Sequence, residues 1–126
     1  MKNNIPQSLR NWFLIHFIVD IILGIPLIFF PEIILQLFGL PGTQAESILA
    51  RLVGAALLGI GGVSFFSYKK SKESFDTLLT MKIIWSTSAI LGLLISISVG
   101  APSSLWILVA IFVVFSLAWI YYKRKI

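Results

Sequence analysis

A few ionisable side chains stand inside the long apolar stretches of this 126-residue sequence, and they are the first candidates for chemistry. His16, Asp20 and Gly24 follow one another at intervals of four residues, which places them on one face of a helix. An imidazole and a carboxyl group one turn apart can transfer a proton or hold a ligand. If the helix enters the membrane near Asn11, a rise of about 1.5 Å per residue puts Asp20 about 14 Å deep, near the bilayer midplane. Charges are costly at that depth, so Asp20 is a functional candidate.

Arg51 is a second charge within an apolar stretch. Counted from Glu46, it lies about 7–8 Å below the outer face. A buried guanidinium without a carboxylate is strongly unfavourable, so we predict that Arg51 points into the bundle toward an acidic partner. Asp20 and Glu32 are the preferred partners, and Glu46 is a third.

Small residues follow Arg51 along the same helix face. Ala55, Gly59 and Gly62 succeed it at spacings of four, four and three. Small side chains at such spacings let two helices approach closely. We therefore expect this Gly/Ala face to be a packing surface within the bundle, and it is also a candidate contact for a homo-oligomer.

Lys82 and Trp85 occupy a third apolar stretch. Two interpretations of Lys82 are open, because it either extends to the inner headgroups or pairs with Asp20. Trp85 lies near mid-membrane, away from the interfaces where tryptophan is enriched. It either walls a pocket for a hydrophobic ligand or fills the core. An ion pair of Asp20 with Lys82 or Arg51 would likewise either fix the helix register or serve a proton- or ligand-linked function.

The segments that must position these residues are Trp12–Phe30, Ile48–Phe66, Leu78–Val99 and Leu105–Tyr122. Hydrophobic residues make up 58% of the chain and charged residues 12%, which is more apolar than a soluble domain of this size can bury. Each segment is close to the roughly 20 residues that cross the hydrocarbon core of a bilayer. Helices are expected because the segments lack the alternation of membrane β-barrel strands.

We therefore predict an all-α fold, a polytopic integral membrane protein with a four-transmembrane-helix bundle as its single domain over residues 1–126. Pro31, Gly39 and Pro41 punctuate the stretch after the first segment, which predicts a short interfacial segment on the outer face. The expected helices cover approximately residues 11–30, 47–67, 77–99 and 104–122, with the interfacial segment at 31–40.

Basic residues fall at the N-terminal flank (Lys2, Arg10), in the second connection (Lys69, Lys70, Lys72) and at the C-terminus (Lys123, Arg124, Lys125). The connections at 38–47 and 100–104 carry neither lysine nor arginine. The positive-inside rule then places both termini in the cytoplasm. The net charge of +5 is thus a topology signal, and no nucleic-acid partner is expected. We expect a multi-pass protein of the cytoplasmic (inner) membrane, surrounded by the lipid bilayer.

The inventory of reactive side chains is small. The chain has no cysteine and one histidine, His16, so thiol chemistry and a multi-histidine metal site are excluded. We predict neither a cofactor nor a bound metal. An enzyme is not expected, although a lipid-modifying activity with His16 and Asp20 as acid and base is left open. No nucleophile motif accompanies them.

Residues 31–42 (PEIILQLFGLPG) and 51–62 (RLVGAALLGIGG) together resemble the DoxX-like group of small four-helix bacterial membrane proteins. The resemblance consists of a Pro-Glu at the end of the first helix, a Phe-Gly turn, and an arginine followed by a helix rich in glycine and alanine. It implies a four-helix membrane fold. Some members of the group are associated with membrane oxidoreductase complexes, but this chain supplies no redox group, so that activity is not transferred to it.

Two functions follow as predictions. The first is to bind a hydrophobic ligand or lipid, or to act as an accessory subunit of a membrane complex, so a hydrophobic small molecule or a membrane protein is the expected partner. The alternative is a small proton-coupled transporter in which Asp20 is the membrane-embedded carboxylate. The chain is similar to the small multidrug resistance proteins in length and helix count, although that family uses a glutamate and its surrounding residues are not matched here.

Overall fold

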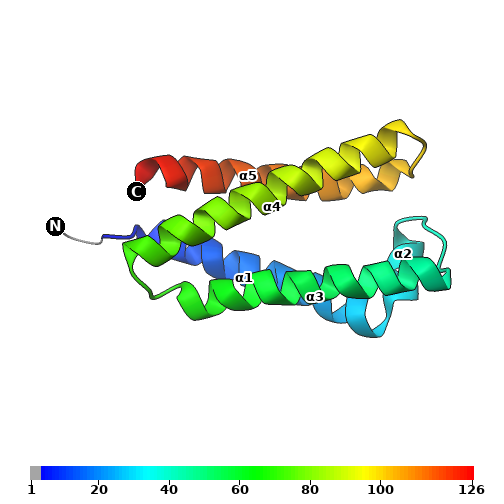
Figure 1. Ribbon diagram of the computed structural model, residues 1–126, viewed down its shortest axis with the longest axis horizontal. Coiled ribbons are helices and arrows are strands. Elements are labelled where there is room, and N and C mark those ends of the chain that lie inside the picture. Colours follow the sequence, from blue (N-terminus) through cyan, green and yellow to red (C-terminus); the bar gives the residue numbers. More distant parts are fainter. Residues whose placement is uncertain (1–3) are drawn as a thin grey trace.

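A computed structural model describes residues 4–126, which form helices joined by short connections (Figure 1). Lys2 of the N-terminal basic flank lies outside the described residues. The elements in chain order are α1 (Gln7–Phe29), α2 (Pro31–Leu37), α3 (Gln44–Ser67), α4 (Lys72–Ser98), the 3-10 helix η1 (Ser103–Leu105) and α5 (Trp106–Lys125). Over the described part of the chain there is no strand, and the predicted all-α four-helix bundle is confirmed.

Four helices are long and apolar enough to cross a membrane: α1, α3, α4, and η1 continued by α5. The most apolar stretch of each has a mean hydropathy between 1.8 and 2.4. Large apolar side chains such as Ile22, Leu52 and Leu117 are exposed on the outside of the bundle. An exterior of this kind suits lipid and indicates a multi-pass membrane protein.

All four long helices extend beyond the segments that predicted them. α1 begins at Gln7 rather than near residue 11, and α3 begins at Gln44 rather than near residue 47. α4 begins at Lys72 rather than near residue 77, and α5 ends at Lys125 rather than near residue 122. Hydropathy marks only the stretch that lies in hydrocarbon. A helix continues for as long as its backbone N–H and C=O groups find hydrogen-bond partners, so polar turns can extend a helix into the headgroup region.

Local punctuation shapes the connection between α1 and α3. Pro31 occupies the first turn of α2, where its missing N–H group is not needed. Gly39 follows that helix with a φ of 73°, a conformation that favours glycine. Thr43 and Glu46 then form a capping box at the start of α3, in which each side chain accepts a hydrogen bond from the backbone N–H of the other. α2 lies within the predicted interfacial segment.

The long helices form two pairs. In Figure 1, α1 lies along α3 and α4 lies along α5, and the pairs draw apart toward the end that carries α2. α1 and α3 approach closely because glycines face each other, and a Cβ atom placed on Gly54 would lie 2.8 Å from the carbonyl oxygen of Gly24. Glycine at helix contacts permits such an approach of two backbones.

The packed core lies at the end of the bundle where both termini are found. Its buried members are Ile5, Leu9, Phe13, Phe75, Leu79, Phe115, Trp119 and Tyr122. Polar contacts tie the helices at the same end. Tyr122 Oη donates a hydrogen bond to Ser8 Oγ at 2.7 Å, and Lys123 Nζ lies 2.5 Å from Asp76 Oδ1. The contact of Tyr122 with Ser8 joins the α4–α5 pair to α1, whereas the contact of Lys123 with Asp76 lies within the α4–α5 pair.

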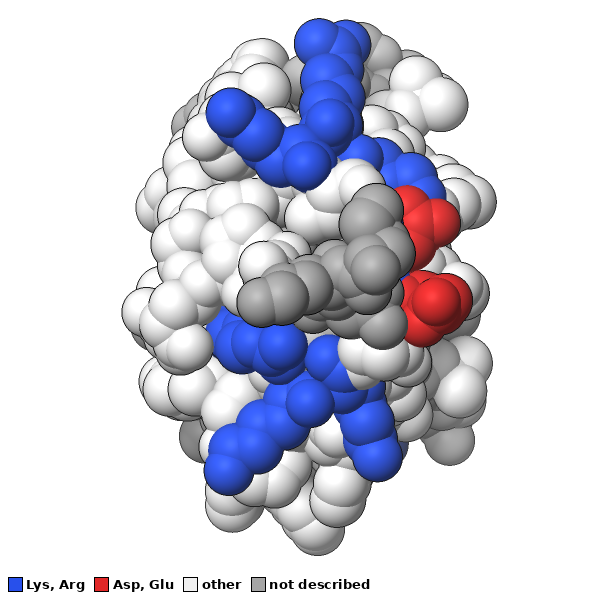
Figure 2. Space-filling view, turned by 90° about the vertical axis from the view of Figure 1, so that its left-hand side faces the viewer, with Lys and Arg blue, Asp and Glu red and all other residues white. Residues whose placement is uncertain are grey.

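Lysine and arginine side chains gather at this same end, which Figure 2 views directly. We call it the basic end and define it by Arg10, Lys69, Lys70, Lys123 and Arg124. The connections from α2 to α3 and from α4 to α5 lie at the opposite end and contain neither lysine nor arginine. The positive-inside rule assigns a basic end of this kind to the cytoplasm.

At the opposite end, the connection that follows α2 reaches across to η1. Ser104 Oγ donates a hydrogen bond to the backbone carbonyl of Phe38 at 2.6 Å. Pro102 also lies against Gly39, because a Cβ atom placed on that glycine would be 3.7 Å from the proline ring. The two pairs are thus joined by a core at the basic end and by a loop contact at the other end.

Candidate functional site

Polar side chains from three helices meet in the interior of the bundle. His16 and Asp20 come from α1, Ser64 from α3 and Lys82 from α4, and each is more than nine-tenths buried. We call these four residues the polar cluster. Lys82 Nζ lies 2.6 Å from His16 Nδ1 and donates a hydrogen bond to Ser64 Oγ. Lys82 therefore points into the bundle and does not extend to the headgroups.

Two aromatic rings enclose the ammonium group of Lys82. Its Nζ atom lies 4.8 Å from the centroid of the Phe13 ring and 5.1 Å from that of Trp119. Aromatic faces attract a cation at this distance, and the attraction is stronger where water is excluded. Lys82 is thus held by one imidazole, one hydroxyl group and two aromatic rings.

His16 links Lys82 to Asp20. A protonated Lys82 can only donate, so its contact with Nδ1 assigns the hydrogen of a neutral imidazole to Nε2. That nitrogen lies 3.4 Å from Asp20 Oδ2. The result is a chain of ammonium, imidazole and carboxylate in which one positive and one negative charge balance. Such a chain can fix the helix register, and it can also pass a proton between its ends.

Asp20 retains unused hydrogen-bonding capacity. Its Oδ2 atom is buried and accepts no hydrogen bond among the residues that the structure describes, because its contact with His16 Nε2 at 3.4 Å is electrostatic only. Gly61 of α3 gives the carboxyl group room, because a Cβ atom at that position would lie 2.7 Å from Asp20 Cβ. A buried carboxylate oxygen without a donor is costly, so Asp20 is a place where an additional donor would be stabilising.

An apolar cavity of about 780 Å³ opens between the two helix pairs, beside Asp20. Side chains from α2 and from all four long helices line it, among them Leu27, Leu57, Leu93 and Phe112. Sites for small molecules and cofactors have volumes of about 300–1,000 Å³ and mostly apolar walls. The size and lining of this cavity therefore suit an apolar molecule or a lipid chain.

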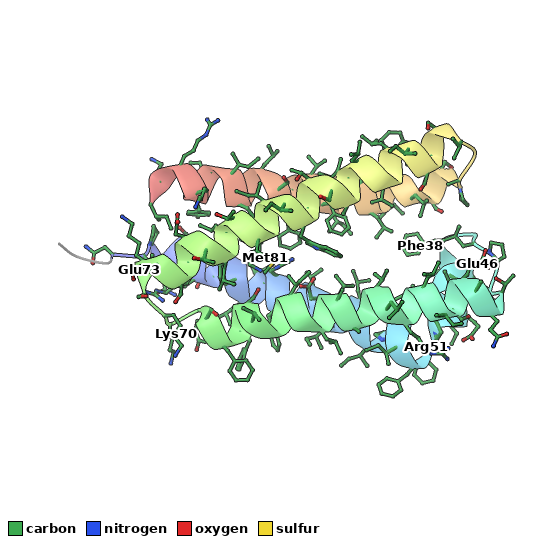
Figure 3. All side chains as sticks on the ribbon, viewed as in Figure 1. Phe38, Glu46, Arg51, Lys70, Glu73 and Met81 are labelled. Carbon is green, nitrogen blue, oxygen red and sulfur yellow. The ribbon has the colours of Figure 1, made fainter. Side chains whose placement is uncertain are left out.

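Polar residues occur at two levels of the cavity wall. At one level, Asp20 of the polar cluster lines the cavity together with Trp85 and Ser88. Glu46 lines it near the opposite end. In Figure 3, Phe38 and Glu46 lie at that opposite end, with the Phe38 ring between α2 and the α4–α5 pair. The cavity thus has apolar walls and a few polar groups that can orient a ligand.

Trp85 lies on the wall of the cavity rather than within a closed core, and a ligand at this wall stays a prediction. Its ring packs edge-on against Phe112, with 6.1 Å between the ring centroids. Its Nε1 atom is buried and has no hydrogen-bond partner within the described range 4–126. Trp85 also lines a second space of about 650 Å³, a groove along α4 that includes Met81 of α4 and Ile60 of α3. Met81 faces this region in Figure 3.

Arg51 does not point into the bundle, and that prediction is wrong. Its side chain is exposed, and Nε donates a hydrogen bond to the backbone carbonyl of Ile28 at 3.0 Å. In the part of the chain that the structure describes, it forms no ion pair with a carboxylate. Figure 3 shows it on the outside of the α1–α3 pair. Ala50 and Gly54 are the buried residues at this level of α3, and Arg51 is rotated about 100° from Ala50.

The Gly/Ala face that follows Arg51 is not the packing surface of α3, so this prediction is also wrong. A Cβ atom on Gly59 or Gly62 would meet nothing within 4 Å. The buried face of α3 instead consists of Ser47, Ala50, Gly54, Leu57, Gly61 and Ser64. Contact between two copies through the outward Gly/Ala face stays a prediction.

Glu32 and Glu46 do not belong to the polar cluster. Glu32 is exposed, and its Oε1 atom accepts a hydrogen bond from Ser47 Oγ at 3.2 Å. Glu46 accepts from the backbone N–H of Thr43 at 3.0 Å. Both carboxylates therefore serve the connection between α2 and α3.

Sequence reasoning missed Ser64 of the polar cluster and the roles of three residues that surround the cluster: Phe13, Gly61 and Trp119. Gly61 and Ser64 continue a second pattern of small residues at spacings of three and four, which could have revealed them. Phe13 precedes His16 by three residues and so shares its face. Trp119 stands near the basic C-terminus, where an interfacial position is the ordinary expectation.

A comparison of the chain with known protein families, with curated proteins and with solved structures finds no match. The resemblance to the DoxX-like group therefore stays a prediction from the sequence.

Proposed function

We propose that this protein binds a hydrophobic ligand or lipid in the cavity between its two helix pairs. The observation that carries the proposal is the cavity itself, about 780 Å³ in volume, lined by apolar side chains from every long helix and bordered by Asp20. In helices that served only to span the membrane, these apolar side chains would pack against one another at the density of a protein interior and would leave no cavity of this size. We place the protein in the cytoplasmic membrane with its basic end in the cytoplasm.

The route to the cavity supports a ligand that comes from the bilayer. Trp85 and Ser88 line both the cavity and the groove along α4, so the two spaces adjoin at these residues. Ile60, Met81 and Ile84 give the groove an apolar side, whereas Asp76, Thr77 and Thr80 also line it. A lipid chain that enters between α3 and α4 along the apolar side would reach the cavity, where burial of its surface would drive binding.

Filling the cavity tests this proposal. Gly92 is exposed and lines the cavity, and a Cβ atom at this position meets nothing within 4 Å, so Gly92→Phe has room for a ring at the cavity wall. Leu91→Phe is the matched control, because Leu91 is 61% exposed and does not line the cavity. Native mass spectrometry of protein purified in mild detergent measures the bound lipid. We expect wild type and Leu91→Phe to retain it and Gly92→Phe to lose it, whereas equal retention in all three would contradict the proposal.

A second candidate function, proton-coupled transport, is favoured by the chain of Lys82, His16 and Asp20 that reaches the same cavity. A carboxylate at mid-membrane that binds a proton and a substrate in turn would couple their movements. We expect Asp20→Asn to abolish proton-coupled efflux from vesicles. Coupled efflux that is equal in the two proteins, or absent from both, would contradict transport.

A further inference from the structure

We propose that the ligand of this cavity is a neutral long-chain lipid whose polar head is a hydroxyl group, placed between Asp20 and Trp85. The inference rests on the proposed function, because it names the chemical class of the molecule that the cavity binds. It derives from two buried polar atoms on the cavity wall and from the charge balance of the polar cluster.

The two atoms are complementary in hydrogen bonding. Asp20 Oδ2 and Trp85 Nε1 are both buried, and neither has a hydrogen-bond partner among residues 4–126. Both residues line the cavity. An ionised carboxylate can only accept a hydrogen bond, and an indole N–H can only donate one. A hydroxyl group is the smallest head that satisfies both, because it donates through its hydrogen and accepts through its oxygen.

The helix register places these two atoms at the same depth. α1 and α4 both start at the basic end, and the contact of His16 with Lys82 aligns them. Asp20 lies four residues beyond His16, and Trp85 lies three residues beyond Lys82. Each is therefore about one turn, or about 5 Å, farther from the basic end than the aligned pair. A head that lies between α1 and α4 at this depth would therefore have both side chains at its own level.

Charge balance in the polar cluster selects a neutral head. The positive charge of Lys82 is already enclosed by His16, Ser64 and two aromatic rings, and Asp20 supplies the compensating negative charge. An anionic head would face Asp20 as a like charge, and an ammonium head would compete with Lys82 for the same carboxylate. Either would leave a buried charge without a partner, which is strongly unfavourable.

The remaining walls accommodate the chain of such a lipid. Leu27, Leu57 and Leu93 line the cavity, and Leu35 and Phe38 line it at the opposite end. A head at Asp20 and a chain directed toward that end would follow this apolar lining. Binding then combines a specific pair of hydrogen bonds with burial of a hydrocarbon chain.

The experiment compares ligands of equal chain length on the full-length protein in detergent. Oleyl alcohol, 1-octadecene, oleic acid and oleylamine are titrated separately, and native mass spectrometry gives an apparent Kd for each. We expect oleyl alcohol to bind about tenfold more tightly than 1-octadecene, because the alcohol gains two hydrogen bonds in an apolar site. Oleic acid and oleylamine should bind more weakly than the alcohol.

Trp85→Phe isolates the donor, because it removes the indole N–H and keeps an aromatic ring on the wall. We expect this variant to lose about fivefold in affinity for oleyl alcohol and to bind 1-octadecene as wild type does. Trp106→Phe is the matched control, since Trp106 is 51% exposed and does not line the cavity. It should leave both affinities unchanged.

Each outcome decides one part of the account. Equal affinity of wild type for the alcohol and the alkene overturns the hydroxyl head and leaves the apolar cavity in place. Tighter binding of the acid or the amine overturns the neutral head. An equal loss of both ligands in Trp85→Phe overturns the role of the N–H group. Failure of all four ligands to bind overturns the proposed function itself.

Discussion

The Lys82 side chain is fully buried, and its surroundings replace most of the contacts that water would make with an ammonium group. His16 and Ser64 accept hydrogen bonds from its ammonium group, and two aromatic rings lie next to that group. The Asp20 carboxylate, which contacts the other side of the His16 ring, supplies the opposite charge. Buried ion pairs of this type are often no more stable than well-packed apolar residues. The polar cluster fixes the helix register and also holds the Asp20 carboxylate on the cavity wall.

Lys82→Met tests the charge balance at this scale. The substitution leaves the Asp20 carboxylate buried without a counter-charge, so we expect the free energy of unfolding to fall by about 3–5 kcal/mol. Unfolding in detergent, followed by circular dichroism against denaturant, measures the change. Lys70→Met is the control, because Lys70 is exposed at the basic end and should change the stability little.

The double variant Lys82→Met with Asp20→Asn removes both charges together. We expect it to be more stable than Lys82→Met alone, since no unpaired charge remains in the interior. If the two substitutions instead reduce the stability additively, Lys82 and Asp20 do not compensate each other.

At the scale of helices, the close contact between α1 and α3 depends on which glycines of α3 face α1. Gly54 and Gly61 meet α1, whereas Gly59 and Gly62 face outward. The sequence predicted the spans and the common face of His16, Asp20 and Gly24 on α1, and the structure shows that this face is buried. The sequence could not predict the rotation of α3 about its axis, because α3 is apolar on most sides and carries small residues on two faces. The prediction that Arg51 points inward is wrong for this reason.

Gly54→Ala and Gly59→Ala form a matched pair that tests the rotation of α3. A Cβ atom on Gly54 would lie 2.8 Å from the carbonyl oxygen of Gly24 and must force the helices apart, so we expect a loss of about 1–3 kcal/mol. Gly59→Ala meets nothing within 4 Å and should leave the stability unchanged or slightly raised. Thermal unfolding in detergent distinguishes them, and a larger loss for Gly59→Ala would mean that α3 packs through its other face.

At the scale of the whole molecule, the bundle is closed at one end and hollow toward the other. Aromatic core residues and the polar contacts of Ser8, Asp76, Tyr122 and Lys123 hold the basic end, whereas the cavity separates the helix pairs beyond Asp20. Hydropathy predicted four spans but not this asymmetry, because the walls of a cavity and the lipid-facing surface have the same apolar composition. Only the packing of the helices distinguishes them.

The orientation of the bundle is accessible to labelling because the chain has no cysteine of its own. Lys70→Cys places a thiol at the basic end, and Gln44→Cys places one at the opposite end. We expect a membrane-impermeant maleimide applied to intact cells to label Gln44→Cys and to label Lys70→Cys only after lysis. The reverse pattern would place the basic end outside.

Photo-crosslinking tests the central claim that an apolar chain occupies the cavity. A long-chain alcohol with a diazirine in its tail is irradiated with the protein in detergent, and mass spectrometry maps the modified residues. We predict modification of lining residues such as Leu57, Leu93 and Phe112, and its loss in Gly92→Phe. Modification confined to the exposed residues Ile22, Leu52 and Leu117, with no effect of Gly92→Phe, would contradict the account.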